Sequence, residues 1–162
     1  MNKNTSFREA SRLAVSLLIP LSAGWIGSVF TMPAIDSWYR EIVKPTLTPP
    51  DFVFGPVWTT LYLLMGYALY LVWREGASVP RVNFSIGIFG VQLVLNTMWS
   101  IVFFGAQNPG GALIIVGLLW MAILANIFAF LRISKTAAYL LVPYLLWVSF
   151  AAFLNFEIWI LN

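Results

Sequence analysis

Apolar residues form long stretches along this chain, and short groups of charged residues separate them. No Asp, Glu, Lys or Arg occurs in residues 13–35, 52–73, 82–131 or 136–156. A helix needs about 20 apolar residues to cross the hydrocarbon core of a bilayer. The first, second and fourth stretches therefore each fit one spanning helix, and the pattern predicts that the chain lies in a membrane.

The third stretch is too long for one span and contains the turn sequence Gln107-Asn108-Pro109-Gly110-Gly111. Splitting it there predicts an all-α membrane protein, a bundle of five transmembrane helices in one domain over residues 1–162. The helices are expected at about residues 13–32, 52–74, 82–105, 110–131 and 136–158. The first stretch, which follows basic residues, has the alternative of a signal peptide. The stretch is longer than the hydrophobic region of a typical signal peptide, and no cleavage site of small residues follows it. A retained helix is therefore the preferred interpretation.

The loop over residues 33–51 is irregular, because it contains Pro33, Pro45, Pro49 and Pro50. Proline removes a backbone donor and restricts the residue before it, so residues 44–50 cannot be helical. Residues 36–41 can form a short interfacial helix. We expect the loop to be structured and to act as a lid over one end of the bundle. A plain connector is the alternative.

Basic residues are distributed unequally between the two ends of the spans. Seven of the nine Lys and Arg residues fall at one end, namely Lys3, Arg8, Arg12, Arg74, Arg81, Arg132 and Lys135. Only Arg40 and Lys44 fall at the other end. The positive-inside rule then predicts a cytoplasmic N-terminus, an external C-terminus and an external first loop.

Composition narrows the class of protein further. Apolar residues make up 60% and charged residues 9% of the chain, and the mean hydropathy is +0.86. A soluble domain carries about 25% charged residues, so a soluble globular domain is excluded. Without Cys or His, disulfides, thiolate or imidazole metal sites and His-dependent triads are excluded as well. The scattered basic residues form no basic face, and we expect no nucleic acid partner and no metal.

Apart from Arg74 and Glu157 at span ends, no Asp, Glu, Lys or Arg lies inside the five predicted spans, which disfavours a pump or a proton-coupled transporter. Aromatic and amide residues instead recur there at helical spacing. The second predicted span carries Trp58 and Tyr62. The third carries Gln92, Asn96, Trp99 and Phe103, and the fifth carries Tyr144, Trp147, Ala151 and Leu154. One interpretation is helix packing with amides as interhelical hydrogen-bond partners. The other is an aromatic-walled pocket for a flat apolar ligand, in which Ala151 and Gly66 leave room.

Longer motifs carry a resemblance that extends over most of the chain. They are Trp38-Tyr39, Lys44-Pro45, Pro49-Pro50, Phe54-Gly55-Pro56-Val57-Trp58-Thr59-Thr60-Leu61-Tyr62, Gln92-Leu93, Leu95-Asn96, Trp99, Phe103-Phe104-Gly105, Pro143-Tyr144-Leu145-Leu146-Trp147, Phe150-Ala151 and Leu154-Asn155-Phe156. In these motifs the chain resembles the TspO/translocator protein family, also called tryptophan-rich sensory proteins and peripheral-type benzodiazepine receptors.

The resemblance implies five tilted helices, a homodimer and a cavity capped by the first loop. It implies ligands such as protoporphyrin IX and flat drugs of the isoquinoline or benzodiazepine type. The binding residues that it implies are Tyr39, Pro49, Trp58, Tyr62, Asn96, Trp99, Trp147, Ala151 and Leu154. Animal members carry a Tyr and an Arg after the Leu-Asn of the last helix, whereas here Phe156 and Glu157 follow, so sterol binding is not implied. We expect a bacterial cell-envelope membrane rather than a mitochondrial one.

The expected function is therefore binding of porphyrins in an aromatic-lined cavity, for sensing, transport or disposal. No cofactor is required, and the partners are the porphyrin, the lipid bilayer and a second copy of the chain. One alternative is a light-dependent enzyme that degrades porphyrin, in which Trp58 and Trp147 are the oxidisable residues. No acid–base pair or nucleophile is visible, so conventional catalysis is not expected. A transporter of sterols or other small molecules is the remaining alternative.

Overall fold

The computed structural model describes residues 3–76 and 79–162, and side chains from residue 7 onward. Lys3, one of the seven basic residues counted above, therefore has its side chain outside the described part. The described residues form α1 (Lys3–Ile35), α2 (Trp38–Glu41), α3 (Asp51–Trp73), α4 (Pro80–Ser100), the π-helix η1 (Ile101–Gly105), α5 (Pro109–Leu131), α6 (Lys135–Leu140) and α7 (Val142–Leu161).

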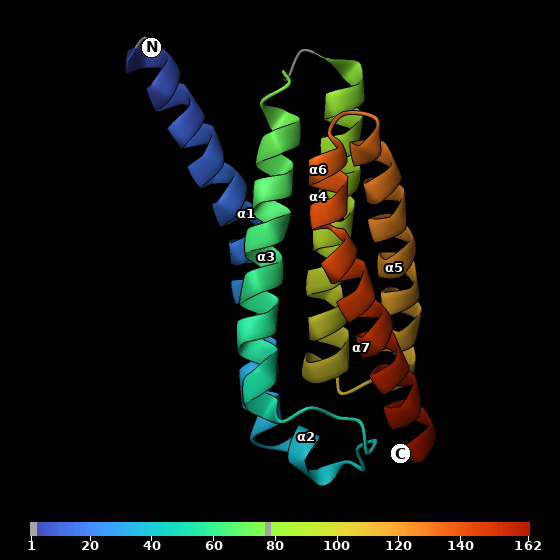
Figure 1. The fold of residues 1–162 in the computed structure, drawn as a ribbon. Helices are drawn as coiled ribbons and strands as arrows, with labels where there is room; N and C mark the ends of the chain where they lie inside the picture. Colours follow the sequence, from blue (N-terminus) through green and yellow to red (C-terminus); the bar gives the residue numbers. More distant parts are fainter. Residues whose placement is uncertain (1–2, 77–78) are drawn as a thin grey trace.

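The segments α3, α4, α5 and α6–α7 run side by side along the long axis of the molecule, and α1 crosses them obliquely, with its N-terminal part apart from the bundle (Figure 1). Each is long and apolar enough to cross a membrane, namely Phe7–Ile35, Asp51–Trp73, Pro80–Gly105, Pro109–Leu131 and Lys135–Leu161. The short helix α2 and the end of α7 lie at one end of the bundle, and the α5–α6 connection lies at the other. The predicted bundle of five spanning helices is confirmed.

Two helices differ from the sequence prediction. Helix α1 begins at Lys3 instead of near residue 13, because charged residues extend the helix beyond the apolar part, with Arg12 and Glu9 paired at 3.1 Å. The last span is divided into α6 and α7 at Leu141. Pro143 has no backbone N–H to donate to the preceding turn, which accounts for this break.

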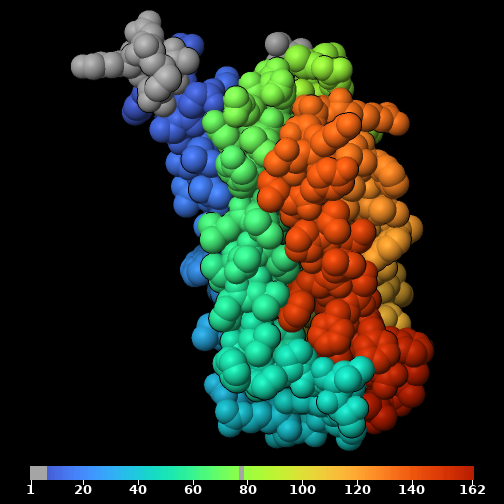
Figure 2. Space-filling model, viewed as in Figure 1, coloured from blue at the N-terminus to red at the C-terminus, as the bar shows by residue number. Residues whose placement is uncertain are grey.

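The loop after α1 crosses the end of the bundle. In the space-filling view it covers that end and meets the C-terminal part of α7 (Figure 2). The backbone N–H of Val43 donates to Asn162 Oδ1 at 2.9 Å, and Asn162 Nδ2 donates to the Val43 carbonyl at 3.0 Å. One side chain thus satisfies both backbone groups of a loop residue and fixes the loop against α7.

The main hydrophobic core occupies the half of the bundle remote from this loop. Its largest fully buried members include Met65, Phe89, Phe130 and Tyr144. Phe89 and Phe130 stack at 6.1 Å between ring centroids, which joins α4 to α5. The half of the bundle beside α2 is packed differently, and it contains the candidate site.

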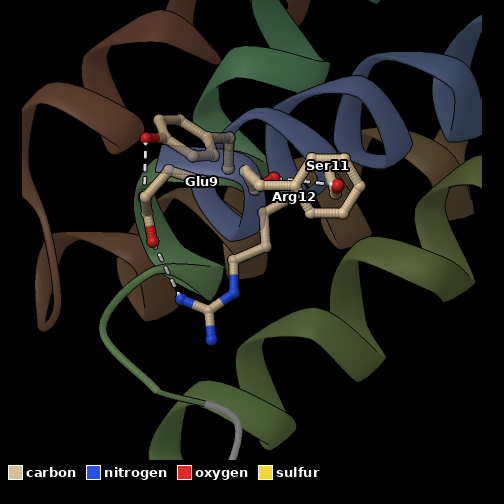
Figure 3. A network of polar contacts seen from close by, with 5 residues as sticks. Glu9, Ser11 and Arg12 are labelled. Carbon is tan, nitrogen blue, oxygen red and sulfur yellow. Dashed lines mark hydrogen bonds and ion pairs between the residues drawn. The ribbon is translucent and has the colours of Figure 1, made fainter. Parts of the chain in front are cut away.

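Helix α1 approaches α3 closely through glycine. A Cβ built on Gly66 would lie 2.7 Å from Leu17 Cα and 2.8 Å from the Ser16 carbonyl oxygen, and one on Gly24 would overlap the ring of Tyr62. Near the N-terminal end of α1, the hydroxyl of Tyr70 on α3 donates to Glu9 at 2.9 Å. Figure 3 shows the Glu9 carboxylate between this hydroxyl and Arg12. Glycine therefore sets the distance between the two helices.

Gly66→Ala tests this close approach. The added methyl group meets backbone atoms, which cannot rotate away, so we expect a loss of about 1–3 kcal/mol in the free energy of unfolding. Gly117→Ala is the matched control, because its new Cβ would meet nothing within 4 Å and alanine favours a helix. Thermal unfolding in detergent measures both. Equal unfolding temperatures for the two variants would contradict the account.

Candidate ligand cavity

A cavity of about 500 Å³ lies in the half of the bundle next to α2. Four helical segments contribute its walls: the C-terminal half of α1, the N-terminal half of α3, the end of α4 with η1, and residues 147–158 of α7. Tyr39 of α2 closes the end. The volume falls in the range of small-molecule sites, roughly 300–1,000 Å³.

Most of the predicted binding residues line this cavity. They are Tyr39, Trp58, Tyr62, Trp99, Trp147, Ala151 and Leu154. Asn96 and Pro49 do not line it. Asn96 is buried behind Tyr62, and Pro49 lies in the loop. Gly66 was expected to leave room for the ligand, and this is wrong, because Gly66 packs against α1.

Asn96 joins three helices by hydrogen bonds. Its Oδ1 accepts from the Tyr62 hydroxyl at 2.7 Å, and its Nδ2 donates to the Tyr144 hydroxyl at 3.1 Å. The amide is 2% exposed, so it has no access to water. Asn96 therefore orients Tyr62, which lines the cavity, and does not reach the cavity itself.

Aromatic rings contact one another along the wall. Trp58 stacks on Tyr62 at 5.5 Å and meets Tyr144 edge-on at 6.2 Å. Trp147 lies edge-on to Phe54 at 5.9 Å, which places α3 and α7 in contact beside the cavity. Such pairs hold the rings in fixed orientations. The cavity therefore has firm, flat and apolar walls on α3 and α7.

The indole N–H groups of the wall are used differently. Trp99 Nε1 donates to Asn155 Oδ1 at 3.0 Å, and Asn155 Nδ2 donates to the Pro109 carbonyl at 2.8 Å. Trp147 Nε1 is buried and has no hydrogen-bond partner among the described residues. A protein acceptor thus accounts for the indole N–H of Trp99, whereas the indole N–H of Trp147 has no acceptor among the described residues.

Several lining residues were not predicted as binding residues. Phe54 belongs to α3, whereas Phe103 and Phe104 belong to η1. Trp99 stacks on Phe103 at 5.2 Å. Phe103 belongs to the aromatic stripe predicted from helical spacing, whereas Phe104 does not, and the wider turn of η1 brings both neighbouring rings to the cavity. The sequence signal for Phe104 was the motif Phe103-Phe104-Gly105.

The loop end of the cavity carries the charged groups. Tyr39 is 5% exposed, and Lys44 Nζ lies 4.1 Å from the centre of its ring. Burial raises the pKa of Tyr39 to about 12, and the negative charge of Asp51 adds to this effect. Tyr39 is therefore a neutral phenol at physiological pH and remains a hydrogen-bond donor at the cavity end.

The difference in hydrogen bonding between the indole N–H groups of Trp99 and Trp147 leads to a stability prediction. Trp99→Phe and Trp147→Phe remove the same ring atoms, but only the first leaves an amide oxygen without its donor. We expect Trp99→Phe to lower the free energy of unfolding by about 1–3 kcal/mol more than Trp147→Phe does. Thermal unfolding in detergent provides the comparison. A larger loss for Trp147→Phe would show that Trp147 has a packing role we have not identified.

Comparison with known proteins agrees with the sequence resemblance. Residues 16–160 match the TspO/MBR family. The chain is 46% identical over 155 residues to the tryptophan-rich protein TspO of Chlorobaculum tepidum, covering 96% of this chain and 98% of that protein. It is 41% identical over 143 residues to the translocator protein of Homo sapiens, covering 88% and 85%. A tryptophan-rich sensory protein of Cereibacter sphaeroides is 38% identical over 127 residues, covering 78% of each. With its five apolar helices, the chain is an integral multi-pass membrane protein.

Proposed function

Because the chain belongs to the TspO/MBR family, we propose that its cavity binds a metal-free porphyrin such as protoporphyrin IX, for sensing, transport or disposal. The supporting observation is the convergence of Trp58, Trp99 and Trp147 from three different helices on one apolar cavity. A porphyrin is a flat aromatic ring system, and indole rings bind such faces by stacking and edge contacts. Tyr39 supplies a hydroxyl group at the loop end, whereas Tyr62 offers its ring, because its hydroxyl donates to Asn96.

Charge at the loop end suggests how the acidic side chains of a porphyrin are placed. Arg40 is exposed and already paired with Asp36 at 2.6 Å. Lys44 lies against Tyr39 instead, whereas Asp51 lines the cavity and repels a carboxylate. In this proposal the propionates lie toward Lys44 and away from Asp51.

Quenching of Trp fluorescence by protoporphyrin IX tests the proposal. Trp147→Phe removes cavity surface and an unpaired N–H, so we expect affinity to fall by about tenfold for each 1.4 kcal/mol of lost contact. Trp73→Phe is the matched control. It removes one indole from the opposite end of α3, outside the cavity, and affinity should not change.

Two outcomes would count against the proposed site. Unchanged affinity in folded Trp147→Phe protein would return Trp147 to a packing role. Equal losses in Trp147→Phe and Trp73→Phe would indicate that porphyrin adsorbs to the apolar surface and does not occupy the cavity.

We also propose that the N-terminus is cytoplasmic and that the loop end of the cavity faces the outside of a bacterial cell envelope. The unequal distribution of Lys and Arg supports this orientation. Reporter fusions after Arg81 and Lys135 should read cytoplasmic, and fusions after Lys44 and Asn162 should read external. A cytoplasmic reading at Asn162 would reverse the orientation.

A homodimer is part of the same proposal. Gly87 and Gly90 lie on the exposed side of α4, and a Cβ at either position would meet nothing within 4 Å. Small residues on an outward helix face permit another helix to approach closely. This face of α4 is therefore the surface that we assign to the second copy.

A further inference from the structure

We infer that the cavity exchanges its ligand directly with the bilayer, through an opening between α1 and α3. The inference rests on the proposed function, because it assumes that the cavity holds a ligand. It adds the source of the ligand: molecules that partition into the membrane, the metal-free porphyrin among them. It also adds the residues that border their path, which are Gly55 and Thr59 on α3 and Trp25, Ser28 and Met32 on α1.

At the level of the cavity, α1 contacts α4 and η1 as well as α3. Along the upper part of the pair, Gly66 lies against Leu17 and Gly24 lies against Tyr62, in both cases with no room for a Cβ. After Gly24, toward the C-terminal end of α1, the nearest atoms belong to α4 and η1. A Cβ on Gly27 would lie 3.1 Å from Ser100 of α4, and one on Gly105 of η1 would lie 3.0 Å from Phe30. The last turns of α1 therefore pack closely on α4 and η1.

Open space lies beside the N-terminal part of α3. A Cβ on Gly55 would meet nothing within 4 Å, and Gly55 and Thr59 are both exposed. On the α1 side, Trp25 is 70% exposed and Met32 is 68% exposed. All of these residues, with Ser28, line the same cavity as the buried Tyr62 and the half-buried Trp99. The cavity is therefore continuous with the outer surface at membrane depth.

The loop end is closed by comparison. Asn162 holds Val43 by two hydrogen bonds. Beneath the loop, Tyr39 packs edge-on against Phe103 at 6.3 Å and Phe104 at 5.6 Å. Exit toward water would require these contacts to break, whereas the side toward lipid has no comparable contact at Gly55. An apolar ligand also avoids transfer through water on the lateral path.

Stopped-flow measurement of porphyrin binding tests the path, with the protein in lipid nanodiscs and Trp fluorescence as the signal. Gly55→Leu places a branched side chain in the open space beside α3. We expect the association and dissociation rate constants both to fall, by about tenfold, because the barrier to passage rises. The association rate constant is diagnostic, since a lost contact with bound porphyrin would raise the dissociation rate constant instead.

Gly117→Leu is the matched control, because it makes the same exchange on an exposed helix position with nothing within 4 Å. Both rate constants should stay as in the unmodified protein. Asn162→Ala releases the loop and should also leave association unchanged. Faster association in Asn162→Ala, with Gly55→Leu unaltered, would place the entrance at the loop and overturn the inference.

A second variant covers the case in which Gly55→Leu fails to fold. The chain contains no cysteine, so Gly55→Cys offers a single thiol that a bulky maleimide modifies after folding. Labelling should slow association as Gly55→Leu does, and unchanged kinetics would overturn the inference. Absence of saturable quenching in the unmodified protein would instead remove the proposed function, and the lateral path with it.

Discussion

The amide of Asn96 is the polar interaction on which the cavity depends. Inside a membrane no water is available to satisfy a buried amide, so its partners must come from neighbouring helices. Tyr62 and Tyr144 provide them, and α3, α4 and α7 are joined at one level of the bundle. On one side of this level the helices form a continuous apolar core, and on the other side they enclose the cavity.

Aromatic side chains allow the second half of the bundle to stay open without collapsing. Trp58 and Trp147 are held by rings from other positions, Tyr62 and Tyr144 in the first case and Phe54 in the second. Rings fixed in this way keep their faces toward the cavity at little further cost in side-chain freedom. The same packing that stabilises the helices therefore provides a pre-formed, flat surface for a ligand.

The spans and most of the wall were predictable from the sequence, but the relative placement of the helices was not. Charge-free stretches locate spans because charged groups are costly in lipid, and the four-residue spacing of Trp58 and Tyr62 places both on one face. Spacing alone did not tell that Asn96 lies behind the wall, or that Gly66 contacts α1. It also did not reveal the π-turn over residues 101–105 or the open space beside Gly55. These features depend on how helices distant in sequence cross.

Photo-oxidation by bound porphyrin tests the central claim, that the aromatic-walled cavity is the ligand site. Illuminated protoporphyrin IX, with dissolved oxygen, oxidises the indoles nearest to it, and peptide mass spectrometry then ranks the Trp residues by rate. With about one porphyrin per chain, the account predicts that the cavity-lining Trp25, Trp58, Trp99 and Trp147 are oxidised before Trp73 and Trp159, although Trp159 is 52% exposed. Oxidation of Trp73 and Trp159 as fast as these four would contradict it.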